Sequence, residues 1–317
     1  MHFLNNKHYQ DNDVITRTFF IIRCQNFYKT LPAPIHRGII LSNLNYLFRT
    51  VFMPKQKNQH YVPRCLLKNF TDKNGKFFIF RLLQNKILDI KIPYYDQCKT
   101  EYFYGSDGII ENKLKKFEDR VSNVFNKIIS NTALNTYEEL CLKQFVLLQY
   151  FRTEHMVDKR LYLMLESLNK ILPTVLIQKG VKFSKEEIDS YIRTYIGKLS
   201  RSDTVQDSVH LALESINHLD DLALEIIHTK NNIVISDHPV IMLNFFQPSY
   251  GHGIDCAGLI LLLPISSNYL CILYDEGIYN IKHENPDCIV DSFNKIQYIQ
   301  ARESLYSNTL ETLQNIK

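Results

Sequence analysis

The spacing of apolar residues changes near residue 232, and this change restricts the fold more than any other feature of the sequence. From 109 to 129, apolar residues recur at steps of three and four, which is the period of an amphipathic helix. After residue 232 they form short runs bounded by Pro, Gly and Asn, which is typical of strands in a mostly buried sheet. Helices followed by strands indicate an α+β fold, because an α/β fold would alternate the two regularly.

Amphipathic helices are predicted through the middle of the chain, over about residues 109–230. The second of them runs from about 136 to 172, with Thr136 as its N-cap, Glu139 as the partner in a capping box and Pro173 as its end. Two further helices are predicted, one that opens at residues 184–187 and one over 203–229.

Strands are predicted on both sides of this helical part. Residues 76–83 and 86–92 are rich in strand-forming residues and are separated by Gln84-Asn85, as in a hairpin. The C-terminal part is predicted to contain four strands, then a helix and a polar tail: 233–236, 240–244, 259–264 and 269–274, with the helix at 286–300. We therefore predict an α+β fold in which a mixed sheet, made by the N-terminal hairpin and the C-terminal strands, packs on a central bundle of amphipathic helices.

Charge divides the sequence into a basic N-terminal segment and a neutral remainder. Residues 1–52 carry six Lys and Arg against two acidic residues, whereas residues 53–317 carry 31 of each kind. We expect 1–52 to be a poorly ordered extension upstream of a natural start at Met53, and 53–317 to form a single α+β domain. A neutral domain argues against a chain-wide basic surface for duplex nucleic acid, although it leaves room for a local basic site.

The cysteines and the apolar runs restrict the cellular compartment. The chain has seven Cys, an odd number, and none of them forms a CxxC pair. We interpret Cys141, Cys271 and Cys288 as small buried apolar residues in a reducing compartment. No run approaches the roughly 20 apolar residues of a membrane-spanning helix. The sequence thus predicts a cytoplasmic protein with no membrane partner.

The sequence contains no strong catalytic motif: it has no P-loop, no Rossmann glycine motif, no HExxH and no GxSxG. The candidate site residues therefore rest on weaker local patterns. The first candidate is the segment that contains Gln59 and His60, just before a helix that Pro63 opens. A helix N-terminus favours anions, and His60 could serve as a general base or a metal ligand. The alternative is a capping amide and a His that is hydrogen-bonded for structural reasons.

The second candidate is Asp237, which follows an apolar run and precedes Pro239. Carboxylates at sheet ends serve metal binding or acid/base chemistry, but a Ser-Asp turn that bonds its own backbone is the alternative. Between the two candidates lie Glu111 on the first helix, and Gln149 and Arg152, which share one face of the second. Polar residues on such a face either point to solvent or converge on a buried site.

Short blocks of the sequence carry a resemblance when they are taken in order. They are Asn58-Gln59-His60-Tyr61-Val62-Pro63, Glu101-Tyr102-Phe103-Tyr104, Ile110-Glu111, Leu148-Gln149, Arg152-Thr153, Ile235-Ser236-Asp237-His238-Pro239-Val240 and Leu263-Pro264-Ile265-Ser266. Over about residues 56–307 the chain resembles the bacterial family catalogued as domain of unknown function 4238, whose members typically begin just before the His-Tyr-Val-Pro signature. His238 departs from this family, which often has Asn at this position.

The resemblance implies no reaction, because the family has no established activity. It does imply that the polar residues of the blocks belong to one shared site rather than to unrelated caps; these residues are His60, Glu111, Gln149, Arg152 and Asp237.

The function we expect from this site is hydrolysis of phosphodiesters, as in a nuclease. His60, Glu111 and Asp237 would bind a divalent cation such as Mg²⁺ or Mn²⁺, or activate water. Arg152 would hold a phosphate with two hydrogen bonds, while Gln59 and Gln149 would bind and orient the substrate. The partner would then be nucleic acid or a nucleotide.

Two other functions fit the same residues. One is a non-catalytic regulatory module that binds an anion, a nucleotide or a partner, which agrees with the neutral charge and the missing catalytic motif. The other is a purely structural network of buried polar groups. The sequence leaves the oligomeric state open.

Overall fold

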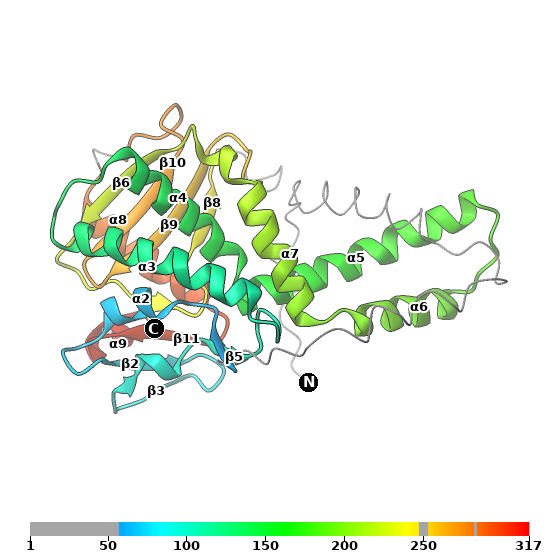
Figure 1. Ribbon diagram of the computed structural model, residues 1–317, viewed down its shortest axis with the longest axis horizontal. Helices are drawn as coiled ribbons and strands as arrows, with labels where there is room; N and C mark the ends of the chain where they lie inside the picture. The colour runs from blue at the N-terminus through cyan, green and yellow to red at the C-terminus, as the bar shows by residue number, and fades with distance from the viewer. Residues whose placement is uncertain (1–56, 247–252, 282–283, 317) are drawn as a thin grey trace.

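The computed structural model describes residues 57–246, 253–281 and 284–316 (Figure 1). The predictions for residues 1–52 and for a start at Met53 lie outside the described residues. The α-helices described are α2 (Arg64–Leu67), α3 (Ile109–Ile129), α4 (Thr136–Phe151), α5 (Glu154–Gln178), α6 (Lys185–Lys198), α7 (Arg201–Glu214), α8 (Pro286–Gln300) and α9 (Leu310–Asn315). Short 3₁₀ helices lie at η1 (Lys68–Phe70), η2 (Tyr94–Asp96) and η3 (Ile216–Leu219).

The strands that the structure describes form three sheets. They are β1 (Asn58–His60), β2 (Lys76–Arg81), β3 (Lys86–Ile87), β4 (Ile92–Pro93), β5 (Lys99–Glu101), β6 (Ala223–His228), β7 (Ile235–Ser236), β8 (Ile241–Asn244), β9 (Leu259–Ser266), β10 (Tyr269–Tyr274) and β11 (Ser304–Ser307). One sheet has the order β6-β10-β9-β8, a second has β3-β2-β11-β7 with β4 also on β2, and β1 pairs with β5. The α+β fold is confirmed, and so is the hairpin of β2 and β3.

The mixed character of the predicted sheet is wrong. Within the described residues every strand pair is antiparallel, and most of the C-terminal strands form a sheet of their own. The N-terminal hairpin does share a sheet with C-terminal strands, through β11 and β7. Between strands that follow each other in the chain, such as β9 and β10, antiparallel pairing follows from the short connection, because parallel neighbours need a long crossover.

The polar tail predicted after the last helix contains a central strand instead. β11 lies between β2 and β7, so that Leu305 pairs with Phe80 on one side and with Ser236 on the other. All four residues of β11 are buried. Two of the four are serines, so the segment has too little apolar character to indicate a buried strand.

The helix predicted over 136–172 is in fact two helices with a break after Phe151. α4 ends there, and α5 starts with Thr153 as N-cap, whose hydroxyl accepts from the backbone N–H of Met156. The apolar pattern continues through the break, so periodicity alone cannot reveal it. The capping box of α4 is also displaced by one residue, to Asn135 and Glu138.

The ends of two other helices differ from the prediction. Pro173 does not end α5, which runs to Gln178 and stops where Gly180 takes φ +67° and its N–H donates to the carbonyl of Ile177. The helix predicted over 203–229 ends at Glu214, and residues 223–228 form β6, which pairs with β10 along its whole length. Tertiary pairing overrides local pattern there. Two predicted helices are confirmed: the one that begins after Ser184, and the one over residues 286–300.

The elements pack around one main apolar cluster, with a helical hairpin outside it (Figure 1). α4 packs on β9, α3 and α7, whereas α8 packs on β7 and β8. α5 and α6 project from the body as an arm, whose outer part has its own cluster formed by Leu168, Leu172, Ile188 and Ile192. None of the helices that the structure describes is both long and apolar enough to cross a membrane.

The predicted burial is confirmed for two of the three cysteines. Cys141 and Cys271 are buried thiols, as is Cys98, whereas Cys288 is exposed on α8. The reason is that Cys288 lies in the first turn of α8, next to the buried stripe but not on it.

Leu305 provides a test of the central position of β11. It is fully buried against Phe80, Val234 and Leu313, so Leu305→Ala should lower the free energy of unfolding by about 2–5 kcal/mol. Ile299→Ala, which changes a side chain that is 75% exposed, should leave stability within about 0.5 kcal/mol. Chemical denaturation measures both. Equal small effects would place residues 304–307 outside the sheet.

Candidate functional site

Arg152 lies at the break between α4 and α5 and is the largest fully buried side chain that the structure describes. Its Nε donates to Gln149 Oε1 at 2.8 Å, and its Nη1 donates to Glu118 Oε1 at 2.6 Å. The guanidinium also lies over the ring of Phe145, 5.5 Å from its centroid. Burying a charge of this kind requires such partners, because isolated ions lose several kcal/mol of hydration.

One nitrogen of this guanidinium has no partner. Arg152 Nη2 is buried, and in the described part of the chain no acceptor lies in position to bond it, although the hydroxyl of Tyr104 lies close to the guanidinium. An unpaired buried donor costs about 1–3 kcal/mol and is rare in folded proteins. Nη2 is therefore a donor that a ligand oxygen could satisfy.

Gln149 holds Arg152 and the N-terminal segment together. Its Nε2 donates to the backbone oxygen of Tyr61 at 3.0 Å, while its Oε1 accepts from Arg152. Both ends of the amide are thus engaged within the protein. This geometry favours a positioning role for Gln149 over the substrate contact expected from the sequence.

Gln59 and His60 are buried in β1 and are also engaged. Gln59 donates to the backbone oxygen of Gly105 at 3.1 Å and accepts from the N–H of Tyr104 at 2.6 Å. His60 Nε2 lies 3.0 Å from the backbone oxygen of Tyr95, so this nitrogen carries the hydrogen and cannot also accept from Arg64 at 3.4 Å. Burial lowers the pKa of His60 to about 4, which leaves the ring neutral at pH 7.

Glu111 lies half-buried in the first turn of α3, near Arg152. The pKa of its carboxyl is raised to about 7, mainly by burial and also by the negative charge of Glu118, while Arg152 opposes the shift. No hydrogen bond or ion pair to the Glu111 side chain is found among the described residues. An acid with a pKa near 7 and a free carboxyl can give or take a proton at neutral pH.

Glu118 is a site residue that sequence reasoning missed. It follows Glu111 by seven residues, which is two helical turns, so both carboxyls lie on the same side of α3. The seven-residue spacing of the two carboxyls could have identified Glu118 from the sequence, but apolar periodicity does not include charged residues. Glu111, Glu118, Gln149 and Arg152 are called the Arg152 cluster below.

Asp237 belongs to a neighbouring network. One carboxylate oxygen accepts from the N–H of Arg302 at 2.9 Å, and the other accepts from Glu303 at 2.7 Å and Ser304 at 3.1 Å. Burial raises the pKa of Asp237 to about 6, while the three N–H groups hold it down. Both oxygens are occupied by the backbone that leads into β11, which favours a structural function for this carboxylate.

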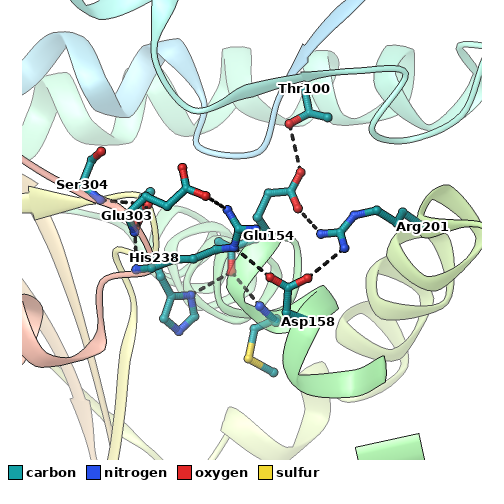
Figure 2. A network of polar contacts seen from close by, with 11 residues as sticks. Thr100, Glu154, Asp158, Arg201, His238, Glu303 and Ser304 are labelled. Atoms are coloured by element: carbon teal, nitrogen blue, oxygen red, sulfur yellow. Dashed lines mark hydrogen bonds and ion pairs between the residues drawn. The ribbon is translucent and has the colours of Figure 1, made fainter. Parts of the chain in front are cut away.

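The rest of this network surrounds the N-terminus of α5 (Figure 2). His238 Nδ1 lies 2.8 Å from the hydroxyl of Thr153, and the ring of His238 stacks on that of His155 with centroids 4.3 Å apart. A chain of ion pairs, of which only Glu154 is buried, then joins α5, α7 and the segment before β11; its members are Glu154, Arg201, Asp158, Arg302 and Glu303.

The predicted site residues thus fall into two groups, both of which contact the break between α4 and α5. Gln149, Arg152 and Glu111 belong to the Arg152 cluster, and Gln59 and His60 adjoin it through Tyr104, whose hydroxyl donates to the backbone oxygen of His60 at 3.1 Å. Asp237 belongs to the other network, which begins one residue later at Thr153. Tyr61 lies between them: Gln149 bonds its carbonyl, and the charge of Asp237 contributes to the raised pKa of its buried hydroxyl.

The predicted divalent cation depended on His60, Glu111 and Asp237. Within the described ranges no group of three or more His, Cys, Asp or Glu side chains lies close enough together to hold a metal ion. His60 Nε2 and both oxygens of Asp237 already make hydrogen bonds in the protein.

Comparison with protein families gives a match over most of the chain. Residues 58–311 match the model of a family described as "Protein of unknown function (DUF4238)". No curated protein and no solved structure matches the chain. The matched segment contains every member of the Arg152 cluster and Asp237.

The raised pKa of Glu111 predicts how its charge affects stability. The folded protein holds this proton up to about pH 7, whereas an unfolded Glu loses it near pH 4.5, so the ionised form opposes folding above pH 7. Glu111→Gln should therefore raise the free energy of unfolding by about 1–2 kcal/mol at pH 8.5, allowing for solvent screening, and by nothing at pH 4. Denaturation at both pH values measures this, with the exposed Asp119→Asn on the same helix as control.

The three backbone N–H groups bound by Asp237 predict a second effect. Asp237→Ala leaves them without an acceptor and should lower the free energy of unfolding by about 2–4 kcal/mol. Asp237→Asn should also destabilise, because its NH₂ would face N–H donors. The exposed Asp89→Asn is the matched control. A stable Asp237→Ala protein with no catalytic activity would instead assign Asp237 to the reaction.

Proposed function

Since the chain belongs to the DUF4238 family, for which no activity can be transferred, we propose from its own geometry that it hydrolyses phosphodiesters at the Arg152 cluster. The observation that carries the proposal is the unbonded Nη2 of the buried Arg152, beside a carboxyl that is half protonated at neutral pH. Arginine is well suited to phosphate oxygens, since its planar group offers several donors in a fixed arrangement.

Glu111 and Glu118 would divide the acid and base work. Two carboxyls on one helix face, one of them holding a proton near pH 7, resemble the acid/base pairs of known hydrolases. Glu118 is paired with Arg152 through Oε1, and its side chain is 22% exposed, so its other oxygen can face incoming water. Glu111 and Glu118 are partly exposed, so a phosphate would approach Arg152 Nη2 from their side. The side chains that cover Nη2 would have to move first.

In the proposed reaction, a bond from water to phosphorus forms and the bond to the leaving oxygen breaks. Arg152 Nη2 donates to a non-bridging phosphate oxygen, and Glu118 takes a proton from water as the water oxygen bonds to phosphorus. The bond from phosphorus to the leaving oxygen breaks, and Glu111 gives that oxygen its proton. Gln149 keeps the guanidinium in place through Nε. His60 and Gln59 support the site from β1 rather than touching the substrate.

A non-catalytic binding module is the second candidate. It is favoured by the engagement of Gln59, His60, Gln149 and Asp237 in hydrogen bonds within the protein, which leaves few side-chain groups for chemistry. In that case Arg152 would hold an anion, a nucleotide or an acidic partner without turnover.

We also propose the cytoplasm as its compartment. The buried thiols of Cys98, Cys141 and Cys271 support this, because a reducing compartment preserves free cysteines.

Hydrolysis of bis(p-nitrophenyl) phosphate, RNA and single-stranded DNA tests the proposal. Glu111→Gln should lower kcat by about 100-fold or more with little change in KM, since it removes a proton donor without removing the phosphate contact. Arg152→Lys should lower kcat/KM, because a point charge replaces a planar donor. The exposed Asp119→Asn is the control and should match the wild type.

Two results would count against catalysis. Wild-type protein that cleaves none of the three substrates but binds them would support the binding module. Activity that survives in both Glu111→Gln and Arg152→Lys would move the reaction to another part of the chain. Integrity of total RNA and DNA after expression of residues 53–317 in a bacterial host gives the same comparison in cells.

A further inference from the structure

The charges that face Glu111 come from three directions. Arg64 of α2 and Arg152 at the end of α4 approach it from the neighbouring elements, while Lys115 and Glu118 flank it on α3 itself. The hydroxyl of Tyr104, in the segment before α3, is also within electrostatic range of Glu111. Three cations thus surround two carboxyls.

The balance of charge here depends on one proton. With Glu111 ionised, three positive charges face two negative ones; with Glu111 protonated, they face only that of Glu118. Arg64 and Lys115 are exposed, so they can turn toward a ligand, whereas Arg152 is fixed by Gln149 and Glu118. A site for an oxyanion is therefore stronger when Glu111 is neutral.

Glu111 also has a hydrogen-bonding reason to be neutral beside an anion. A carboxylate only accepts hydrogen bonds and repels an oxyanion, whereas a carboxylic acid has one O–H to donate. The Glu111 side chain has no partner among the described residues, so its O–H would be free to do this. A second negative charge nearby favours the protonated form still more.

We propose that an oxyanion and a proton bind together at the Arg152 cluster: the anion accepts from Arg152 Nη2, and Glu111 takes up a proton from solvent and donates it as a hydrogen bond to the anion. This inference rests on the proposed function, because it concerns the same site. The ligand class is a phosphate-like oxyanion. In the hydrolytic reaction the proton loaded in this way is the one that the leaving oxygen receives.

Sulfate is the probe of choice, because it keeps two negative charges across the relevant pH range and contains no bond that the reaction cleaves. Isothermal titration of the full chain would be run at pH 6 and at pH 8.5. With the pKa of free Glu111 at about 7, the protonated fraction falls about 30-fold between these values, and sulfate affinity should fall by the same factor. Titration in two buffers of different ionisation heat should show uptake of a proton at pH 8.5.

Glu111→Gln separates this effect from other titrations. Its amide is a permanent donor without charge, so this variant should bind sulfate with nearly equal affinity at both pH values. Asp237, whose pKa of about 6 lies at the acid end of the range, remains unchanged in it. Asp119→Asn is the matched control and should keep the full pH dependence. Arg152→Lys should bind sulfate more weakly at both pH values.

The outcomes distinguish this inference from the function on which it rests. Sulfate binding by the wild type that does not change with pH, or that changes equally in Glu111→Gln, would overturn the coupling but leave the anion site intact. If neither protein binds sulfate or a dinucleotide at pH 6, the anion site itself is wrong, and the proposed function falls with it.

Discussion

The fully buried guanidinium of Arg152 constrains how α3, α4 and the N-terminal segment pack against one another. Arg152 can lie in the interior only because Glu118 of α3, Gln149 of α4 and the ring of Phe145 surround it. Taking such a charge out of water is expensive, and removing one partner of a buried pair is strongly destabilising. The packing of α3 on α4 is therefore tied to the ion pair, and Gln149 extends it to the segment just after β1 by bonding the carbonyl of Tyr61.

Local features of the fold were predictable from the sequence, whereas contacts between distant segments were not. The hairpin of β2 and β3 and the opening of α6 at Ser184 depend on neighbouring residues, so turn and capping patterns indicate them. The break after Phe151 and the strand β11 depend on partners far away in sequence. Asp237, for example, is fixed by N–H groups 65 to 67 residues further on.

The candidate site shows the same division. Gln149 and Arg152 do share a face and do bond each other, as their spacing indicates. The residue types of His60 and Asp237 indicate catalysis, but burial and backbone partners set what such groups can do, and these are tertiary properties. Glu118 was missed although it lies two turns from Glu111, since its importance arises only from the arginine that it meets.

The position of β11 has a consequence for how the chain acquires its structure during synthesis. This strand is inserted between β2 and β7, so residues made early must wait for residues 304–307 before their sheet can close. Until then β2 and β7 present open edges, which can pair with strands of other molecules. Contacts of such long range are slow to form. A ribosome-bound or truncated chain that ends before residue 304 would thus expose an adhesive surface that the finished protein lacks.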